Sequence, residues 1–366
     1  MKLSMHIAVF LAGWTLYVDA VEEHQTNSVH DVCDLLTSLS VEGQMLTRFN
    51  GVIFNDFKTG KNAISEGPLA IGGSFRGDNA MINQRNELSC GAETESSLFG
   101  HHGLILKGTT ESAVKVNGFA HIQDVENSLV TTPLNECSVK TAATNFDFEI
   151  ARTQALAMSR DFAGMLPNWS IDKMGAIVNI VSEGISVKQP YNLFSMPVYC
   201  PAGPSHAKNY FACKVDHDCE IPAQHLSDVH AMFLGKTSNW TGPVVQDYPQ
   251  DKLMVINIPV TDGQTFDIQT KNPSIKINAC NTIYNFYAVD KQGRYEPEGN
   301  FTLKRSTEKS LNGMILAPQA HVIDSSTGSF AGQIIADSYE SNADGIQIQD
   351  YQSASTGKCQ AFAGCV

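Results

Sequence analysis

The chain has 366 residues, of which 17% are charged, and its formal net charge is −13 at pH 7. This balance excludes a nucleic-acid partner, because phosphate binding needs concentrated Lys and Arg and the sequence contains no basic cluster. The length suits one large domain or two, and the abundance of Ser, Thr, Asn and Gly is typical of a β-rich extracellular protein.

Residues 1–20 predict a secretory signal peptide. Lys2 gives a positive start, residues 5–18 are almost entirely apolar, and small residues near Ala20 mark a cleavage point. The alternative is an N-terminal membrane anchor, but the apolar run is short for a bilayer span of about 20 residues. Later segments predict no transmembrane span, so we expect residues 21–366 to form a single domain that is secreted, extracellular, and associated with a cell surface or wall.

The first strand-like region covers residues 49–130, where short apolar runs alternate with glycine-containing turns. Residues 113–117, Ala-Val-Lys-Val-Asn, alternate apolar and polar side chains as half-buried strands do. This region therefore predicts a series of short β-strands.

One long α-helix is predicted over about residues 147–164. Asp147 lies where the helix begins and favours its dipole, and Gly164 and Pro167 end it. Apolar residues recur there at steps of three and four, which gives the helix a single apolar face. These residues are Phe148, Ala151, Ala155, Met158, Phe162 and Met165.

An irregular insertion is predicted over about residues 190–248, where proline, cysteine, histidine and polar residues replace any strand or helix periodicity. Long loops of this kind are usually functional or disordered, so the insertion is one candidate place for a ligand. Strands resume over about residues 250–350. The nearly continuous apolar run at 252–260, Lys-Leu-Met-Val-Ile-Asn-Ile-Pro-Val, is typical of a strand buried on both faces in a parallel sheet.

A short phrase repeats inside this last region. Residues 313–317, Gly-Met-Ile-Leu-Ala, are echoed nineteen residues later by residues 332–336, Gly-Gln-Ile-Ile-Ala. This period fits one coil of a β-solenoid, in which each strand stacks on the previous one about 4.8 Å away and glycine forms tight corners. We expect Leu316 and Ile335 to point into the interior. The alternative is a β-sandwich with similar hairpins.

The fold predicted from these features is mainly β: a right-handed β-solenoid (β-helix) with one long flanking α-helix and an irregular disulfide-containing insertion. The C-terminal coils are expected over about residues 250–350.

All nine cysteines lie after the signal peptide. In an oxidising compartment most of them should pair, and an odd number leaves at least one free or bridged to another chain. Cys213 with Cys219 and Cys359 with Cys365 are the easiest local pairs, although spacing alone does not fix the connectivity. The candidate disulfide cysteines are Cys200, Cys213, Cys219, Cys280, Cys359 and Cys365.

Three sequons mark candidate N-glycosylation sites at Asn168, Asn239 and Asn300. In a eukaryotic secretory pathway they predict glycans on exposed loops. The cluster of cysteines and histidines at 213–230 has residues that bind zinc, but disulfides compete for these thiols in a secreted chain. The sequence therefore predicts neither a metal site nor a cofactor.

Several motifs, in order, resemble the choice-of-anchor A family. The chain has "FNGVIFNDF" and "SEGPLAIGGSF" before the helix, and "TIYNFYAV" and "GMILAPQAHV…GSFAGQIIADSY" after it. The phrase "LAPQA…GQIIA" also resembles the coils of ice-binding β-solenoid proteins. The residues that match the family motif and that we expect to be structural are Gly67, Ala70, Gly72, Gly73, Gly313, Leu316, Ala317, Pro318, Gly332 and Ala336. Other matching residues are Asn50, Asp56, Glu66, Leu69, Asn285, Phe286, Ile315 and Ala320.

The resemblance implies a secreted or surface-displayed adhesive domain. We therefore expect a non-catalytic binding protein whose ligand is extracellular, either a glycan or cell-wall component or a surface protein. Two alternatives are an ice-binding protein and a polysaccharide-processing β-helix enzyme. No long Thr-x-Thr ladder supports ice binding, and "GGSFRG" has Arg76 where a nucleophile elbow needs its last glycine, so no catalytic residue is predicted.

Overall fold

The computed structural model describes residues 41–85, 90, 100–123, 128–134, 136–141, 146–180, 191–198, 210–211, 219–220, 225–228, 230–235 and 240–363. The expected signal peptide, residues 1–20, lies outside this part of the chain.

The N-terminal part begins with helix α2 (Val41–Arg48) and continues as short strands. In chain order the strands are β1 (Gly51–Ile53), β2 (Phe57–Lys58), β3 (Ile64–Ser65), β4 (Leu69–Ile71), β5 (Phe75–Arg76), β6 (Ala80–Ile82), β7 (His102–Leu106), β8 (Val114–Val116), β9 (Phe119–Ile122), β10 (Val130–Thr131) and β11 (Val139–Thr141).

The long helix α3 (Phe148–Ala163) separates this part from the C-terminal strands. These elements are β12 (Trp169–Ile171), β13 (Ile177–Asn179), β14 (Tyr191–Ser195), β15 (Tyr210–Phe211), β16 (Cys219–Glu220), the π-helical turn η2 (His230–Leu234), β17 (Leu253–Thr261), β18 (Thr265–Ile268), the 3₁₀ turn η3 (Ala279–Asn281), β19 (Thr282–Val289), β20 (Phe301–Arg305), β21 (Leu311–Ile323), β22 (Phe330–Glu340), β23 (Gln347–Ile348) and helix α4 (Tyr351–Ala354).

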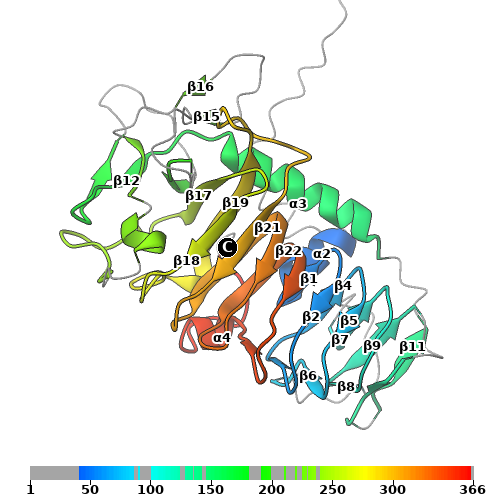
Figure 1. Ribbon diagram of the computed structural model, residues 1–366. Coiled ribbons are helices and arrows are strands. Elements are labelled where there is room, and N and C mark those ends of the chain that lie inside the picture. The colour runs from blue at the N-terminus through cyan, green and yellow to red at the C-terminus, as the bar shows by residue number, and fades with distance from the viewer. Residues whose placement is uncertain are drawn as a thin grey trace, which may run out of the picture.

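The described strands form large, mostly parallel sheets, which confirms the mainly β prediction. A 16-stranded sheet contains the path β11-β9-β7-β4-β1-β22-β21-β19-β17-β14-β12-β13, and a 5-stranded sheet has the order β10-β8-β6-β3-β23. The first strand and the last long strand are therefore neighbours, and they meet in the middle of the molecule (Figure 1). From there the N-terminal strands extend to one end of the sheet, and α3 runs along its side toward the other end.

The repeated phrase is explained by the pairing of β21 with β22, which run parallel. The glycines at the start of the two copies have positive φ angles, 140° at Gly313 and 112° at Gly332. A Cβ atom on Gly332 would lie 2.5 Å from the Gly313 carbonyl oxygen, so a side chain does not fit between the two strands. The two copies lie in register: Gly313 with Gly332, Ile315 with Ile334, Leu316 with Ile335 and Ala317 with Ala336.

Along its path from β7 to β14, the large sheet is buried on both faces. Ile315 and Ile334 belong to the core between the two sheets, whereas Leu316 and Ile335 belong to a second core that packs against α2 and α3. The expected direction of Leu316 and Ile335 is therefore wrong, although both are fully buried. Successive residues of a strand point to opposite faces. In each copy of the phrase, one side chain of the apolar pair therefore packs into the core between the sheets and the next packs into the second core.

The helix predicted over about residues 147–164 is confirmed as α3. The Asp147 carboxylate caps its first turn by accepting hydrogen bonds from the backbone N–H groups of Glu149 and Ile150. At the other end, Asn257 donates from its side chain to the Phe162 carbonyl (2.7 Å), and Asn285 donates to the Ser159 carbonyl (2.9 Å). Buried asparagines of β17 and β19 thus anchor the last turns of the helix to the sheet.

The predicted insertion, about 190–248, begins later than expected. Tyr191–Ser195 is strand β14, all of it buried, and it pairs in parallel with β17. The five-residue run was missed because it follows Pro190 directly and is too short to show a period. After residue 198 much of the insertion lies outside the described part of the chain.

Candidate binding face

Six neighbouring strand segments present one continuous outward surface. They are β18, β20, the C-terminal halves of β21 and β22, β2 and β5, which pair in that order. The central residue of each segment is buried in the core between the sheets, so the residues on either side of it face outward in two rows. We call this surface the outer face. Its buried central residues are Phe266, Leu303, Val322, Tyr339, Phe57 and Phe75.

The first row of the outer face, which we call the polar row, carries small and hydroxyl-bearing side chains. His321 and Ser338 lie at its centre, with 2.9 Å between the imidazole Nδ1 and the serine Oγ. The Asp56 carboxylate accepts a hydrogen bond from the Ser74 backbone N–H at 2.8 Å. The polar row consists of Thr265, Thr302, His321, Ser338, Asp56 and Ser74.

The second row, which we call the charged row, lies two residues further along each strand. It consists of Asp267, Lys304, Ile323, Glu340, Lys58 and Arg76. Ion pairs join neighbouring strands along this row: 3.7 Å for Lys304–Asp267, 2.8 Å for Lys58–Glu340, and 3.0 Å between Arg76 and Glu111, which follows β7.

The ionisation of Glu340 is set mainly by its neighbour on β2. The Lys58 ammonium donates a hydrogen bond to the Glu340 carboxylate and holds the pKa of this carboxyl below its usual value, against the opposing effect of partial burial. Glu340 is therefore a fixed negative charge at neutral pH, next to the imidazole Nε2 of His321 at 3.7 Å.

A cleft of ≈ 500 Å³ lies where the two rows cross β22, β2 and β5. Its floor is rigid, because the rings of Phe75, Phe57 and Tyr339 stack beneath it with centroid distances of 5.4 and 4.7 Å. The cleft is lined by Asn55, Asp56, Lys58, Arg76, His321, Ser338, Tyr339 and Glu340. Cations, carboxylates, amide and hydroxyl groups therefore converge on one shallow polar depression.

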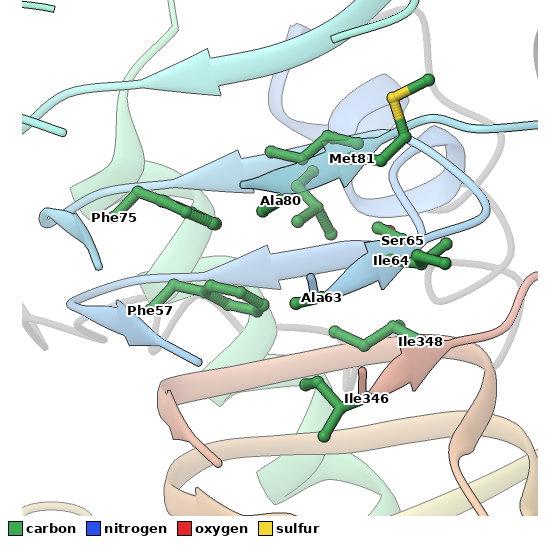
Figure 2. Close-up of a pocket in the computed structure, with 11 residues that line it drawn as sticks. Phe57, Ala63, Ile64, Ser65, Phe75, Ala80, Met81, Ile346 and Ile348 are labelled. Atoms are coloured by element: carbon green, nitrogen blue, oxygen red, sulfur yellow. The ribbon is translucent and has the colours of Figure 1, made fainter. Parts of the chain in front are cut away.

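The interior between the sheets is tightly packed near Phe57 and Phe75. Figure 2 shows the void between the sheets near Phe57, Phe75 and Ala63, with apolar side chains directed into it. The void has a volume of ≈ 10 Å³, which is at most enough for one water molecule, and its lining is apolar. This part of the interior is packed core, so a ligand would contact the outside of the sheets.

Most of the family-motif residues lie in the strands and the turns beside them, whereas Asp56, which also matches the family, lies on the outer face. Gly72 allows a close approach between neighbouring strands, because a Cβ there would lie 2.2 Å from the Phe54 carbonyl oxygen. Pro318 lies at the register shift between Ala317 and His321 of β21. The remaining members Gly67, Ala70, Gly73, Gly313, Leu316, Ala317, Gly332 and Ala336 belong to strands or the turns beside them. We assign these residues to packing.

The disulfides differ from the local pairs expected from spacing. Cys280, just before β19, is bonded to Cys359, after α4, so the expected pair of Cys359 with Cys365 is wrong. Cys90 is bonded to Cys137, and neither was a candidate. Both bridges join residues far apart in sequence that the stacked strands bring together. The side chains of Cys200, Cys213, Cys219 and Cys365 lie outside the described part of the structure.

The three sequons lie in different surroundings. Asn168 is buried: its side-chain amide donates to the Tyr191 carbonyl (2.8 Å), and its oxygen accepts from the Leu193 N–H (2.7 Å). A glycan at this nitrogen would disrupt both contacts. Asn300 is exposed before β20, and Asn239 lies outside the described residues. Of the two sequons in the described part of the chain, Asn300 is the one with space for a glycan.

The described residues contain no group of three or more His, Cys, Asp or Glu side chains arranged to hold a metal ion. Most of the cysteine and histidine cluster at 213–230 lies outside them. No helix among the described residues has the length and apolar character needed to cross a membrane.

The outer face was not predicted from sequence, although a signal for it exists. Three strand segments carry a polar–apolar–polar triplet after a buried strand: 56–58 is Asp-Phe-Lys, 74–76 is Ser-Phe-Arg, and 338–340 is Ser-Tyr-Glu. Aligning these triplets beneath the glycine phrases would have placed Asp56, Ser74 and Ser338 in one row and Lys58, Arg76 and Glu340 in the other.

Comparison with known protein families gives one match. A family described as "Putative Ice-binding-like adhesive domain" matches residues 42–348, which include all strands of the outer face. Comparisons with curated proteins and with solved structures give no match.

Proposed function

We propose that this chain, which belongs to the ice-binding-like adhesive domain family, is a secreted, non-catalytic adhesion protein that holds an extracellular glycan or cell-wall component on its outer face. The observation that carries the proposal is that the polar row runs across six strand segments and the charged row follows it, interrupted at Ile323, with a cleft toward the β22, β2 and β5 end. An extended rigid face of this kind suits a polymer better than a small molecule.

We further infer that the parallel strands are successive coils of a right-handed β-solenoid. Two observations support this reading. The N-terminal chain passes repeatedly between the two sheets, with β4, β7 and β9 in the large sheet and β3, β6 and β8 in the small one. Neighbouring strands also pair in parallel with the repeated phrase in register. In this arrangement the outer face is one side of the stack, and α3 covers another.

The absence of catalysis is part of the proposal, and the charged groups of the cleft support it. An acid catalyst needs a carboxyl whose pKa is raised toward neutrality, but the hydrogen bond from Lys58 lowers the pKa of Glu340. Lys58 and Arg76 are already in ion pairs, which suits positioning more than proton transfer.

Ice binding is the weaker alternative. The hydroxyls of the polar row favour it, because ice-binding surfaces are flat arrays of small hydroxyl-bearing residues. The charged row opposes it, since the half-exposed side chains of Lys58 and Arg76 stand beside the hydroxyls and interrupt a flat array.

A binding screen tests the proposal. The secreted protein would be incubated with soluble glycans, insoluble polysaccharides and wall preparations, and the retained protein measured. We expect retention by at least one polysaccharide without release of reducing sugar, and no thermal hysteresis. Release of reducing sugar would favour the polysaccharide-processing enzyme, and thermal hysteresis would favour the ice-binding protein; absence of any retention would contradict the proposal.

A further inference from the structure

Two cations stand side by side at the β2–β5 end of the outer face. Lys58 of β2 and Arg76 of β5 are register partners on neighbouring parallel strands, so their side chains leave the sheet at the same level. Both line the cleft, and their side chains keep 46% and 49% of their surface exposed. Like charges at directly opposed positions destabilise a sheet, so this pairing lowers the stability of the fold.

The carboxylates that accompany these cations lie on the far sides of the pair. Glu340 is on β22, beyond Lys58, and Glu111 follows β7, beyond Arg76. The order across the sheet is therefore negative, positive, positive, negative. Between the two inner charges the protein supplies no carboxylate along this row.

We propose that the cleft binds a carboxylate group of an acidic polysaccharide between Lys58 and Arg76, with the sugar hydroxyls directed to the polar row. This rests on the proposed function, and it specifies the chemical class of the ligand. The Arg76 guanidinium provides a planar fork for a carboxylate, and the Lys58 ammonium adds a second charge beside it. A bound carboxylate would also relieve the repulsion between the two cations.

The surrounding groups define which anions fit. Asp56, fixed by the Ser74 N–H, and Glu340, fixed by Lys58, border the two cations on the polar-row and β22 sides. Together they offset the two positive charges, so a densely charged polyanion gains no net attraction here, whereas a single carboxylate placed between the cations gains from close contact with both. The Asp56 carboxylate and Ser338 hydroxyl can accept hydrogen bonds from sugar hydroxyls, as can the Asn55 amide oxygen.

The experiment compares polygalacturonate with its fully methyl-esterified form, which has the same backbone without the charge, and with dextran sulfate. We expect the full chain to bind polygalacturonate at least about tenfold more tightly than the ester, and the double variant Lys58→Gln/Arg76→Gln to lose this preference. One charge-assisted contact of about 1.4 kcal/mol corresponds to a factor of ten. Lys304→Gln, in the same charged row but outside the cleft, is the matched control and should keep the preference.

Several outcomes would overturn the inference: equal affinity for the ester, equal or tighter binding of dextran sulfate, an unchanged preference in the double variant, or no binding of polygalacturonate. A folding defect is identified by the unfolding midpoint, and the single variants Lys58→Gln and Arg76→Gln then repeat the comparison. Binding of a neutral polysaccharide without any preference for the acidic one would contradict this inference but not the proposed function. If no polysaccharide and no wall preparation retains the protein, both are contradicted.

Discussion

Arg305 brings a positive charge into the core beside the outer face, where its side chain is fully buried. Its guanidinium donates to the Asp324 carboxylate (2.7 Å) and to the Thr307 carbonyl (2.7 Å). Burial raises the pKa of the Tyr339 hydroxyl well above its usual value, so it stays protonated and donates to the same carboxylate at 2.7 Å. This network connects β20 and β22 with the turn after β21, beneath the cleft.

Removing one partner of such a buried pair leaves the other charge without compensation, which costs about 3–5 kcal/mol. We therefore expect Arg305→Met to lower the free energy of unfolding by about that amount, measured by denaturant titration. Lys304→Met on the same strand is the control. Its ion pair with Asp267 is 3.7 Å long and its side chain is 45% exposed, so we expect a loss below about 1 kcal/mol. Equal effects of the two variants would contradict the structural role of Arg305.

Individual residues were predicted unevenly from the sequence. Gly313 was predicted to form a tight corner, which is wrong: it lies inside β21, where its positive φ angle and the close approach of the Thr282 carbonyl oxygen still require glycine. The pairing of Cys280 with Cys359 could not be predicted, since it depends on how distant strands stack. His321 and Lys58 were missed for the same reason: a site made by neighbouring strands has no local spacing in the sequence.

Helix α3 covers the main sheet on the face opposite the interior. Its buried residues, among them Ala151, Ala155 and Phe162, pack against Leu316 and other residues of the second core. The sequence predicted this helix well, because one amphipathic period over four turns is a local signal. It predicted the direction of Leu316 incorrectly, because a strand buried on both faces has no alternation to show which side chain faces which core.

Truncating Leu316 tests the packing of the helix on the sheet. The side chain is fully buried, so we expect Leu316→Ala to lower the free energy of unfolding by about 2–5 kcal/mol. Ile150→Ala, on α3 itself but with 47% of its surface exposed, should change it by less than about 0.5 kcal/mol. A wild-type unfolding midpoint for Leu316→Ala would mean that α3 does not pack on this part of the sheet.

Contacts between the N-terminal strands and the C-terminal segments join the two parts of the described chain. β1 pairs with β22, and the buried Asn50 amide donates to the carbonyls of Gly332 (2.6 Å) and Gln349 (3.0 Å). Arg85 adds ion pairs with Glu66 (2.8 Å) and Asp350 (2.6 Å). The N-terminal and C-terminal strands consequently share one core, although the sequence places α3 and the insertion between them.

Shared packing of this kind predicts cooperative unfolding. We expect thermal and denaturant unfolding to give one transition by both fluorescence and circular dichroism. A fragment of residues 21–140 would lose the β22 partner of β1, so we expect it to lack a stable fold when expressed alone. Two separate transitions, or an independently stable fragment, would show that the two ends are distinct domains.

The proposed adhesion through the outer face requires an open polar row. The most direct test places one large side chain in this row and the same side chain on the other sheet. Ser338→Tyr fills the centre of the cleft, and Gln347→Tyr puts the new ring at an exposed position of β23.

The measured quantity is the dissociation constant for the polysaccharide or wall preparation that retains the wild-type protein best. We predict at least a tenfold increase for Ser338→Tyr and no change for Gln347→Tyr, with equal unfolding midpoints. Unchanged binding by a folded Ser338→Tyr variant would contradict the assignment and direct the search to residues 190–248.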